Sequence, residues 1–323
     1  MERRIKTPFG AQPPVGPAPV LHTPFFHECS SQMTTGPDPL HAAHALRPLS
    51  QWPQYRRTAV HGILTDIDDT LTTDGAITPD ALAALGALRA AGLAVIAVTG
   101  RPVGWSAPFA AAWPVDAIVA ENGAVALVAG QENNGQIGPE GTAGKRRQLS
   151  KTYLQDAATR SAHFALMQQV LAQIEATVPG ARRATDSPGR ETDIAIDHSE
   201  FTQLPQAQID QCVQLMRAAG MNATVSSIHI NGWFGAHDKW QGARWMVRTL
   251  YGRALEDETD RWVYVGDSTN DQVMFQHLPL SVGVANIARF AAQLQYLPRY
   301  VTQGERGAGF AELAQALLAA SRT

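Results

Sequence analysis

The chain has 323 residues, enough for one large or two medium domains, and its 45 % hydrophobic and 17 % charged content is that of an ordinary globular protein. A formal net charge of −3 argues against a general nucleic-acid binder, and no apolar run approaches the roughly 20 residues that span a bilayer. The two cysteines, Cys29 and Cys212, lie far apart and imply no disulfide framework. We therefore expect a cytoplasmic protein, a monomer or homodimer, with neither nucleic acid nor membrane as a partner.

The N-terminal segment differs in composition from the rest of the chain. Residues 1–57 are rich in Pro, Gly, His, Ser and Thr and show no sustained hydrophobic periodicity. Such a segment buries too little apolar surface to offset its chain entropy. The composition predicts a Pro-rich, largely disordered tail, followed by a folded core whose first part covers residues 58–130.

The first expected strand ends in a cluster of acids. An apolar run over residues 59–64 stops at Asp66, Asp68 and Asp69, which predicts a buried strand, with a polar Asx-turn loop as the alternative interpretation. In open parallel sheets, ligands bind beyond the carboxyl ends of the strands. Because crowded carboxylates repel one another, a hard, oxygen-preferring cation such as Mg²⁺ would stabilise this cluster.

Alternation of helix and strand continues along the chain. Thr78 and Pro79 are typical of a helix start, and Gly92 of a helix end. Continuous apolar runs at 93–98 and 117–120 predict two further buried strands, ending at Thr99-Gly100-Arg101 and Glu121-Asn122-Gly123. These alternations predict a doubly wound, Rossmann-like parallel α/β sheet.

The pattern changes after a polar, Gly-rich break at residues 130–150. Helices are expected at 156–178 and 205–220, and strands at 192–197 and 225–230, which together predict an α+β domain inserted over residues 131–232. The parallel pattern resumes in the second part of the core, residues 233–323. Its elements are expected at 240–251 (helix), 262–265, 281–285 and 300–302 (strands), and 311–320 (helix).

Four polar clusters follow expected strands or precede a returning helix. They are Asp66/Asp68/Thr70, Thr99-Gly100-Arg101, Lys239, and Asp267/Asn270/Asp271. Phosphoryl transfer needs a nucleophile, a divalent ion held by carboxylates, donors for the phosphate oxygens and a cation. Taken alone, Lys239 is better interpreted as a solvated residue at a helix start. Together with the other three clusters, it is expected to supply the positive charge that phosphoryl transfer needs.

In this order, the clusters resemble the four motifs of the haloacid dehalogenase-like (HAD) phosphatase superfamily. The insertion between the second and third motifs resembles subfamily IIB, which includes Cof-type, mannosyl-3-phosphoglycerate and sucrose-phosphatase-like enzymes. The resemblance covers residues 58–320. Many relatives have Gly where this chain has Asp69, which raises a question about local charge.

The resemblance implies roles for individual residues. Asp66 would attack phosphorus and form an aspartyl-phosphate, Asp68 would be the acid and then the base, and Lys239 would be the bridging cation. Mg²⁺ would be held by the Asp66 carboxylate, the Asp68 carbonyl and Asp267, with Asp271 in support. Because family members that cleave carbon–halogen bonds lack the residue matching Asp68, this chain is expected to act on phosphate.

Other residues would bind the substrate. The expected phosphate and substrate ligands in the core are Thr99, Gly100, Arg101, Asn122 and Asn270. The inserted domain would act as a cap that selects the leaving group, with Arg190 beside Asp193 and His229 beside Asn231 as its candidates. Each of these cap residues, taken alone, is better explained as an ordinary surface residue.

The combined expectation is a Mg²⁺-dependent phosphatase that hydrolyses a small phosphorylated metabolite, a sugar phosphate or phosphorylated glycoside. Two alternatives remain open. A phosphomutase-type phosphotransferase shares the motifs, and a non-catalytic phosphometabolite-binding protein could use the same pocket.

Overall fold

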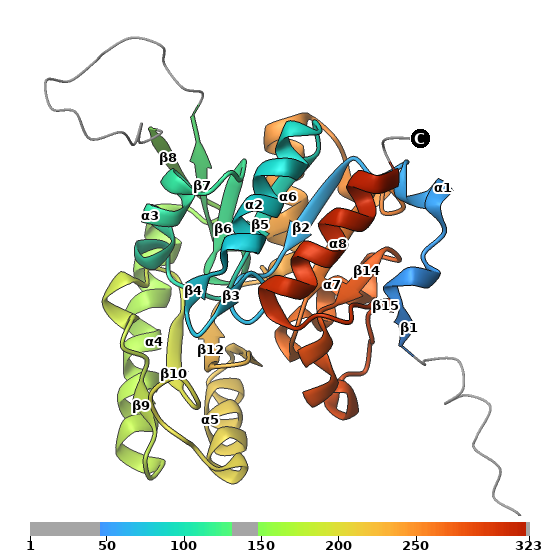
Figure 1. Cartoon of the computed structure of the whole chain (residues 1–323). Helices are drawn as coiled ribbons and strands as arrows, with labels where there is room; N and C mark the ends of the chain where they lie inside the picture. Colours follow the sequence, from blue (N-terminus) through green and yellow to red (C-terminus); the bar gives the residue numbers. More distant parts are fainter. Residues whose placement is uncertain (1–45, 131–147, 321–323) are drawn as a thin grey trace, which may run out of the picture. The chain divides into compact units, whose positions relative to one another are not determined.

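A computed structural model describes residues 46–130 and 148–320 (Figure 1). Nine strands of these residues form one central sheet. Their order across it is β1 (Arg47–Pro48), β15 (Tyr300–Val301), β14 (Ser281–Gly283), β13 (Trp262–Gly266), β2 (Gly62–Thr65), β5 (Ala94–Val98), β6 (Ala117–Ala120), β7 (Val125–Ala129) and β8 (Leu149–Tyr153). Neighbours from β1 to β6 are parallel, whereas β7 and β8 are antiparallel additions at one edge.

Helices cover both faces of this sheet, which explains the continuous apolar runs of its central strands. One face packs against α2 (Pro79–Ala90), α3 (Val103–Ala112) and α8 (Arg306–Ala320). The other packs against α6 (Lys239–Tyr251) and α7 (Gln272–His277). The predicted doubly wound α/β fold is thereby confirmed.

The folded core begins earlier than the composition predicts. Residues 47–57, expected to belong to the tail, form β1, the short helix η2 (Leu49–Gln51) and α1 (Gln54–Arg57). Trp52 is buried and stacks on Tyr300 with ring centroids 5.5 Å apart. One buried aromatic side chain therefore anchors a segment whose composition is otherwise that of a tail. The remainder of the predicted tail lies outside the described residues.

A second layer of structure, here called the inserted module, comprises residues 154–238. Its antiparallel sheet has the order β11 (Asn222–Val225), β12 (His229–Trp233), β10 (Ile194–Asp197) and β9 (Arg182–Arg183). The helices α4 (Ala157–Thr177) and α5 (Gln206–Ala218) share a separate core with this sheet. The module therefore has the expected α+β composition.

The inserted module begins later than the expected residue 131. Residues 149–153 form β8, which pairs with β7 in the central sheet. This strand, Leu-Ser-Lys-Thr-Tyr, lies at the edge of the sheet and is mostly exposed. An edge strand needs little apolar surface, so its sequence resembles the polar break that precedes it. Most of that break, residues 131–147, lies outside the described residues.

The remaining elements are short. They are the hairpin β3 (Thr72–Thr73) and β4 (Ala76–Ile77), and the 3₁₀ turns η3 (Glu121–Gly123), η4 (Ser187–Gly189), η5 (Leu255–Asp257), η6 (Thr269–Asp271), η7 (Ala285–Arg289) and η8 (Ala291–Gln293). The strand expected at 225–230 is divided in the structure, because Val225 ends β11, residues 226–228 form a tight turn and His229 begins β12. This turn faces the loops at the carboxyl ends of β2, β5 and β13, where it completes a pocket.

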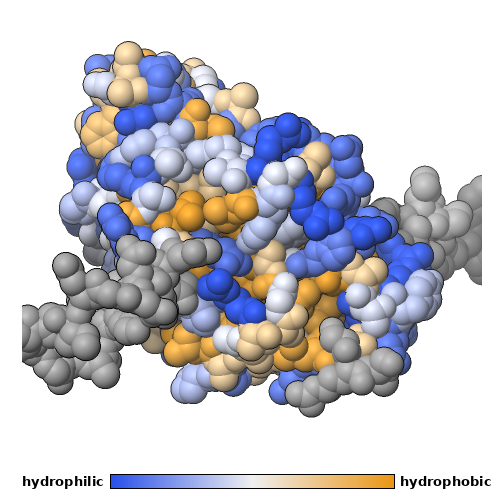
Figure 2. Space-filling model, turned by 90° about the horizontal axis from the view of Figure 1, so that it is seen from above, coloured by the Kyte–Doolittle hydropathy of each residue, from blue (hydrophilic) through white to orange (hydrophobic). Residues whose placement is uncertain are grey.

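Among residues 46–130 and 148–320, no helix combines the length and apolar character needed to cross a membrane. On the face shown in Figure 2, hydrophobic residues lie in separate patches among hydrophilic ones.

Candidate active site

A buried lysine joins two carboxylates at the centre of the sheet edge. Lys239 Nζ lies 2.6 Å from Asp66 Oδ1 and 2.7 Å from Asp271 Oδ1, and Lys239 is 1 % exposed. Tyr264, from the neighbouring strand β13, donates its hydroxyl hydrogen to Asp271 Oδ1. Three segments far apart in the sequence therefore meet at this point, as the order of the motifs predicts.

Local structure fixes Lys239 at the first position of α6. Asp238 caps the helix by accepting a hydrogen bond from Gln241 N at 2.7 Å. The helix start also approaches Gly123 closely, since a Cβ there would lie 2.1 Å from the Asp238 carbonyl oxygen. Gly123 has a φ of 109°, so only glycine fits both the conformation and the space.

Three buried carboxylates could hold a metal ion. Asp66, Asp267 and Asp271 each offer an oxygen within 4.8 Å of the others. Asp271 is already saturated, because its Oδ1 accepts from Lys239 and Tyr264 and its Oδ2 from the Asp267 and Ser268 amides. Asp267 Oδ1, by contrast, is buried and has no hydrogen-bond partner. An orphaned carboxylate oxygen beside Asp66 fits a hard divalent cation.

The electrostatics of this cluster favour such a cation. The pKa of Asp66 is raised to about 7, because burial and the nearby charges of Asp271 and Asp68 together outweigh the lowering effect of Lys239. Burial and the charges of Asp271 and Asp66 also raise the pKa of Asp267 well above its usual range. One ammonium group does not compensate three crowded carboxylates, so a divalent cation would relieve their repulsion.

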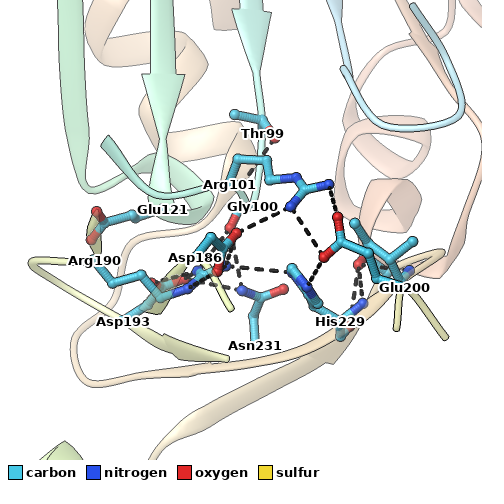
Figure 3. A network of polar contacts seen from close by, with 12 residues as sticks. Thr99, Gly100, Arg101, Glu121, Asp186, Arg190, Asp193, Glu200, His229 and Asn231 are labelled. Atoms are coloured by element: carbon cyan, nitrogen blue, oxygen red, sulfur yellow. Dashed lines mark hydrogen bonds and ion pairs between the residues drawn. The ribbon is translucent and has the colours of Figure 1, made fainter. Parts of the chain in front are cut away.

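The Asp68 carboxylate forms an ion pair with Arg101. Arg101 Nε lies 3.0 Å from both Asp68 oxygens, and the same guanidinium contacts Glu200 at 2.7 Å and Asp186 at 3.2 Å. Glu200 and Asp186 belong to the inserted module (Figure 3). Arg101, expected to bind phosphate, is therefore interpreted as a bridge between the core and the module.

Glu200 carries charge at neutral pH. Although its burial acts to raise the pKa, hydrogen bonds from His229 and Arg101 lower it to about 2. His229 Nε2 lies 2.8 Å from Glu200 Oε2. The predicted substrate ligand His229 is thus joined to Arg101 through Glu200.

A second buried ion network holds Gly100. Arg190 donates to the Gly100 carbonyl at 3.0 Å, to Asp193 Oδ1 at 2.8 Å and to Asp186 Oδ1 at 3.0 Å (Figure 3). Asn231 donates to the same carbonyl at 3.3 Å and to Asp193 Oδ2 at 3.1 Å. Arg190 is 4 % exposed, and these contacts fit a role in positioning the Thr99–Arg101 loop.

The turn after β6 also contacts the module. The Glu121 carboxylate accepts hydrogen bonds from the backbone amides of Val103, Glu191 and Thr192 and from the Thr192 hydroxyl. Asn122 donates to Asp193 Oδ2 at 3.3 Å. The predicted ligand Asn122 therefore lies in the contact between core and module.

A small pocket lies among these groups. Its lining includes six predicted site residues, namely Asp66, Asp68, Gly100, Arg101, His229 and Asn270, together with Ser226, Ser227, Ile228 and Asn231 of the module. Its volume of about 10 Å³ holds about one water molecule. Thr99 is buried beside it, where its hydroxyl accepts from the Arg101 amide at 3.0 Å. A substrate can therefore enter only if the module moves relative to the core.

Several residues of the site have no signal in the sequence. Glu200, Asp186 and Glu121 face partners 70 or more residues away. Asn286 donates to Asp267 Oδ2 at 3.0 Å, and it lies in a turn without a recognisable pattern. Polar side chains paired across long sequence distances are found only once the fold brings them together.

Part of the chain matches a known protein family. Residues 63–168 match the family of haloacid dehalogenase-like hydrolases, and this segment contains the first two motifs. Over this segment the chain is similar to the haloacid dehalogenase-like hydrolases. The resemblance stated from the motifs is confirmed, as is the expectation of an enzyme. No curated protein matches the chain in sequence.

Solved structures share the HAD fold at low identity. The C-terminal domain of trehalose-6-phosphate phosphatase from C. albicans has a TM-score of 0.60 and 13 % identity, covering 85 % of this chain and 98 % of its own. Sucrose-phosphatase from Synechocystis, solved with sucrose and phosphate, has a TM-score of 0.54 and 17 % identity. The match covers 80 % of this chain and 98 % of that structure. A HAD subclass IIB sugar phosphatase has a TM-score of 0.51 and 14 % identity, and the match covers 80 % of this chain and 96 % of that structure. The likeness therefore includes the inserted module.

Proposed function

We propose that this HAD hydrolase is a Mg²⁺-dependent phosphatase that hydrolyses a small phosphorylated metabolite, a sugar phosphate or phosphorylated glycoside. The observation that carries the proposal is the buried Lys239–Asp66–Asp271 cluster beside the orphaned Asp267 oxygen. The sugar phosphatases among the structural neighbours support the substrate class. A cytoplasmic location remains a prediction from cysteine usage.

The reaction has two steps. In the first, a carboxylate oxygen of Asp66 attacks phosphorus, the bond from phosphorus to the leaving oxygen breaks, and the carboxylic acid of Asp68 gives its proton to that oxygen. In the second, Asp68 takes a proton from a water that attacks phosphorus, and the aspartyl-phosphate bond breaks. Asp66 is then a free carboxylate again.

The other groups orient the reacting atoms and neutralise their charge. Asp66 and Asp267 would hold Mg²⁺, which would supply charge stabilisation for the phosphate oxygens. Lys239 holds the Asp66 carboxylate in place, while Asp271 and Tyr264 hold Lys239. Gly100 and Asn270 line the pocket, where they can donate hydrogen bonds to the phosphoryl group. The inserted module acts as the cap that excludes water from the closed site.

Metal removal is the first test of this function. Phosphate release from a panel of phosphorylated sugars, glycosides, phosphoglycerates and p-nitrophenyl phosphate is measured with Mg²⁺ and with chelator. We expect Mg²⁺-dependent release from at least one sugar phosphate. Chelation should lower the rate by about 10³-fold, because the metal contributes several kcal/mol, and added Mg²⁺ should restore it.

The controls separate the alternatives. Transfer of phosphate to a second sugar without free phosphate would identify a phosphomutase-type enzyme, and binding without turnover would identify a binding protein.

Thermal unfolding provides a readout of metal binding besides activity. Mg²⁺ should raise the Tm of the wild type but not of Asp267→Asn, and an equal rise in both would contradict the metal site.

A further inference from the structure

A second pocket lies at the opposite end of the central sheet from the candidate active site, and we call it the rear pocket. Its volume of about 780 Å³ is within the range of small-ligand sites. The strands β2, β5, β6 and β13 border it with residues at or just before their amino ends, whereas the candidate active site lies at the carboxyl ends. Its lining includes His61, Arg89, Asp116, Tyr251, Arg253 and Trp262. No step of the proposed reaction uses these residues.

Part of the lining of the rear pocket is apolar. Trp262, the first residue of β13, is buried, and its ring centroid lies 5.8 Å from that of Tyr251. A Cβ on Gly62 would lie 2.4 Å from the Trp262 ring, so the lack of a side chain there makes room for the indole. Val60 and Leu93 also line the pocket. These groups offer an apolar and aromatic surface to the body of a ligand.

Arg253 brings unused hydrogen-bond donors to the rear pocket. Its Nε donates to the two carboxylate oxygens of Glu258, at 3.0 and 2.7 Å, and its terminal nitrogens make no hydrogen bond within the described residues. Arg89, by contrast, lies 2.8 Å from Asp116, which also accepts from the Val95 amide at 2.8 Å. Arg253 therefore presents the edge of a guanidinium group with which a ligand can pair.

His61 offers a second unused donor. Its Nε2 lies 3.3 Å from Arg261 Nη1, and because arginine only donates, the neutral ring carries its proton on Nδ1. Burial and the charges of Arg253 and Arg261 lower the pKa of His61, so the neutral form predominates at pH 7. Nδ1 has no hydrogen-bond partner among the described residues, since Glu258 Oε2 is 4.0 Å away.

The Tyr251 hydroxyl offers a third donor. It is buried and lies near Asp116, but it makes no hydrogen bond of ordinary geometry to any described residue. Burial and the charge of Asp116 raise the pKa of Tyr251, so the hydroxyl keeps its hydrogen. A buried hydroxyl or ring N–H without a partner costs free energy, which an acceptor atom would offset. Three side chains thus offer donors to one pocket, which indicates a ligand with acceptor oxygens.

The charges around the rear pocket indicate the charge of that ligand. They are the guanidinium groups of Arg89, Arg253 and Arg261 and the carboxylates of Asp116, Glu258 and Asp260. With three charges of each sign, a ligand that carries one negative charge disturbs the balance less than a phosphate monoester with nearly two. An uncharged ligand would form only the weaker, neutral hydrogen bonds with Arg253.

We propose that the rear pocket is a binding site for a small monocarboxylate with an apolar body. The carboxylate accepts hydrogen bonds from the terminal nitrogens of Arg253 and from Tyr251 and His61, and the body lies against the apolar lining. A guanidinium group and a carboxylate match in a planar geometry with two parallel hydrogen bonds. The proposal does not depend on the phosphatase function, because the two sites share no residue.

The test uses benzoate as the probe and the uncharged benzamide as its comparison. Each is titrated into the wild type at pH 7 with chelator present, and binding is followed by ligand-observed NMR. We expect benzoate to bind at least about tenfold more tightly than benzamide, because hydrogen bonds between charged groups are the stronger ones. Arg253→Gln should raise the Kd for benzoate about tenfold. Arg248→Gln makes the same change at a position that is 68 % exposed and should leave the Kd unchanged.

A second variant keeps the test decisive if Arg253→Gln affects folding. Tyr251→Phe removes one hydroxyl group and should raise the Kd for benzoate about threefold. Both arginine variants are expected to keep the wild-type Tm within about 3 °C, because partly exposed ion pairs contribute little. Absence of benzoate binding to the wild type, equal binding of benzamide, or a Kd unchanged in both Arg253→Gln and Tyr251→Phe would overturn the proposal.

Discussion

Asp66→Asn is expected to lower phosphate release by about 10⁵-fold or more, because an amide cannot attack phosphorus. The same change should leave the free energy of unfolding of the metal-free protein unchanged or raise it by about 1 kcal/mol. Burial raises the pKa of Asp66 to about 7, so its charge is costly at neutral pH, and Lys239 keeps Asp271 as a partner. Activity is measured as phosphate release and stability by urea unfolding.

Asp210→Asn is the matched control for this variant, since Asp210 is exposed and contacts Gln206 within its own helix. Asp210→Asn should change neither the rate of phosphate release nor the free energy of unfolding. If Asp66→Asn kept more than a small fraction of wild-type turnover, Asp66 would not be the nucleophile.

Lys239→Met is expected to affect stability and activity together. The substitution keeps a long side chain but leaves the buried Asp66 and Asp271 carboxylates without their cation. Breaking a buried pair in this way costs about 3–5 kcal/mol, and loss of the charge at the site should lower kcat by about 10²–10³-fold. Urea unfolding and phosphate release measure the two effects.

Lys151→Met makes the same chemical change at the surface. Lys151 pairs with Glu191 at 2.8 Å, but both side chains are partly exposed, so the pair is worth at most about 1 kcal/mol. Equal losses of stability in the two lysine variants would contradict the interpretation of Lys239 as the cation that holds the buried cluster together.

The central strands and the acids at their ends could be predicted from the sequence because burial on both faces leaves a clear pattern. The strands β2, β5 and β13 are nearly continuous apolar runs, and each stops at a polar cluster. The carboxyl ends of adjacent parallel strands lie at one edge of the sheet, so the clusters were expected to meet there. Lys239 required the order of all four motifs, since a single lysine at a helix start carries no specific signal.

The edge strands and the contacts between core and cap could not be predicted in this way. β8 is mostly exposed and β1 has two residues, so neither has a hydrophobic period. Arg101 was expected to bind phosphate because it follows Thr99 and Gly100. Its carboxylate partners Asp186 and Glu200 lie 85 and 99 residues further along the chain, and no local pattern indicates such pairing. The same holds for Glu121, whose strand-end position does not reveal the cap amides that it binds.

The most direct measurement of the central claim is the detection of phosphate on Asp66 itself. The enzyme is mixed with Mg²⁺ and p-nitrophenyl phosphate, quenched in acid during turnover, and digested for peptide mass spectrometry. A phosphoryl group assigned to Asp66, absent without Mg²⁺ and absent in Asp66→Asn, is the predicted result. Turnover with no phosphorylated peptide, or with the phosphoryl group on another residue, would contradict the covalent mechanism.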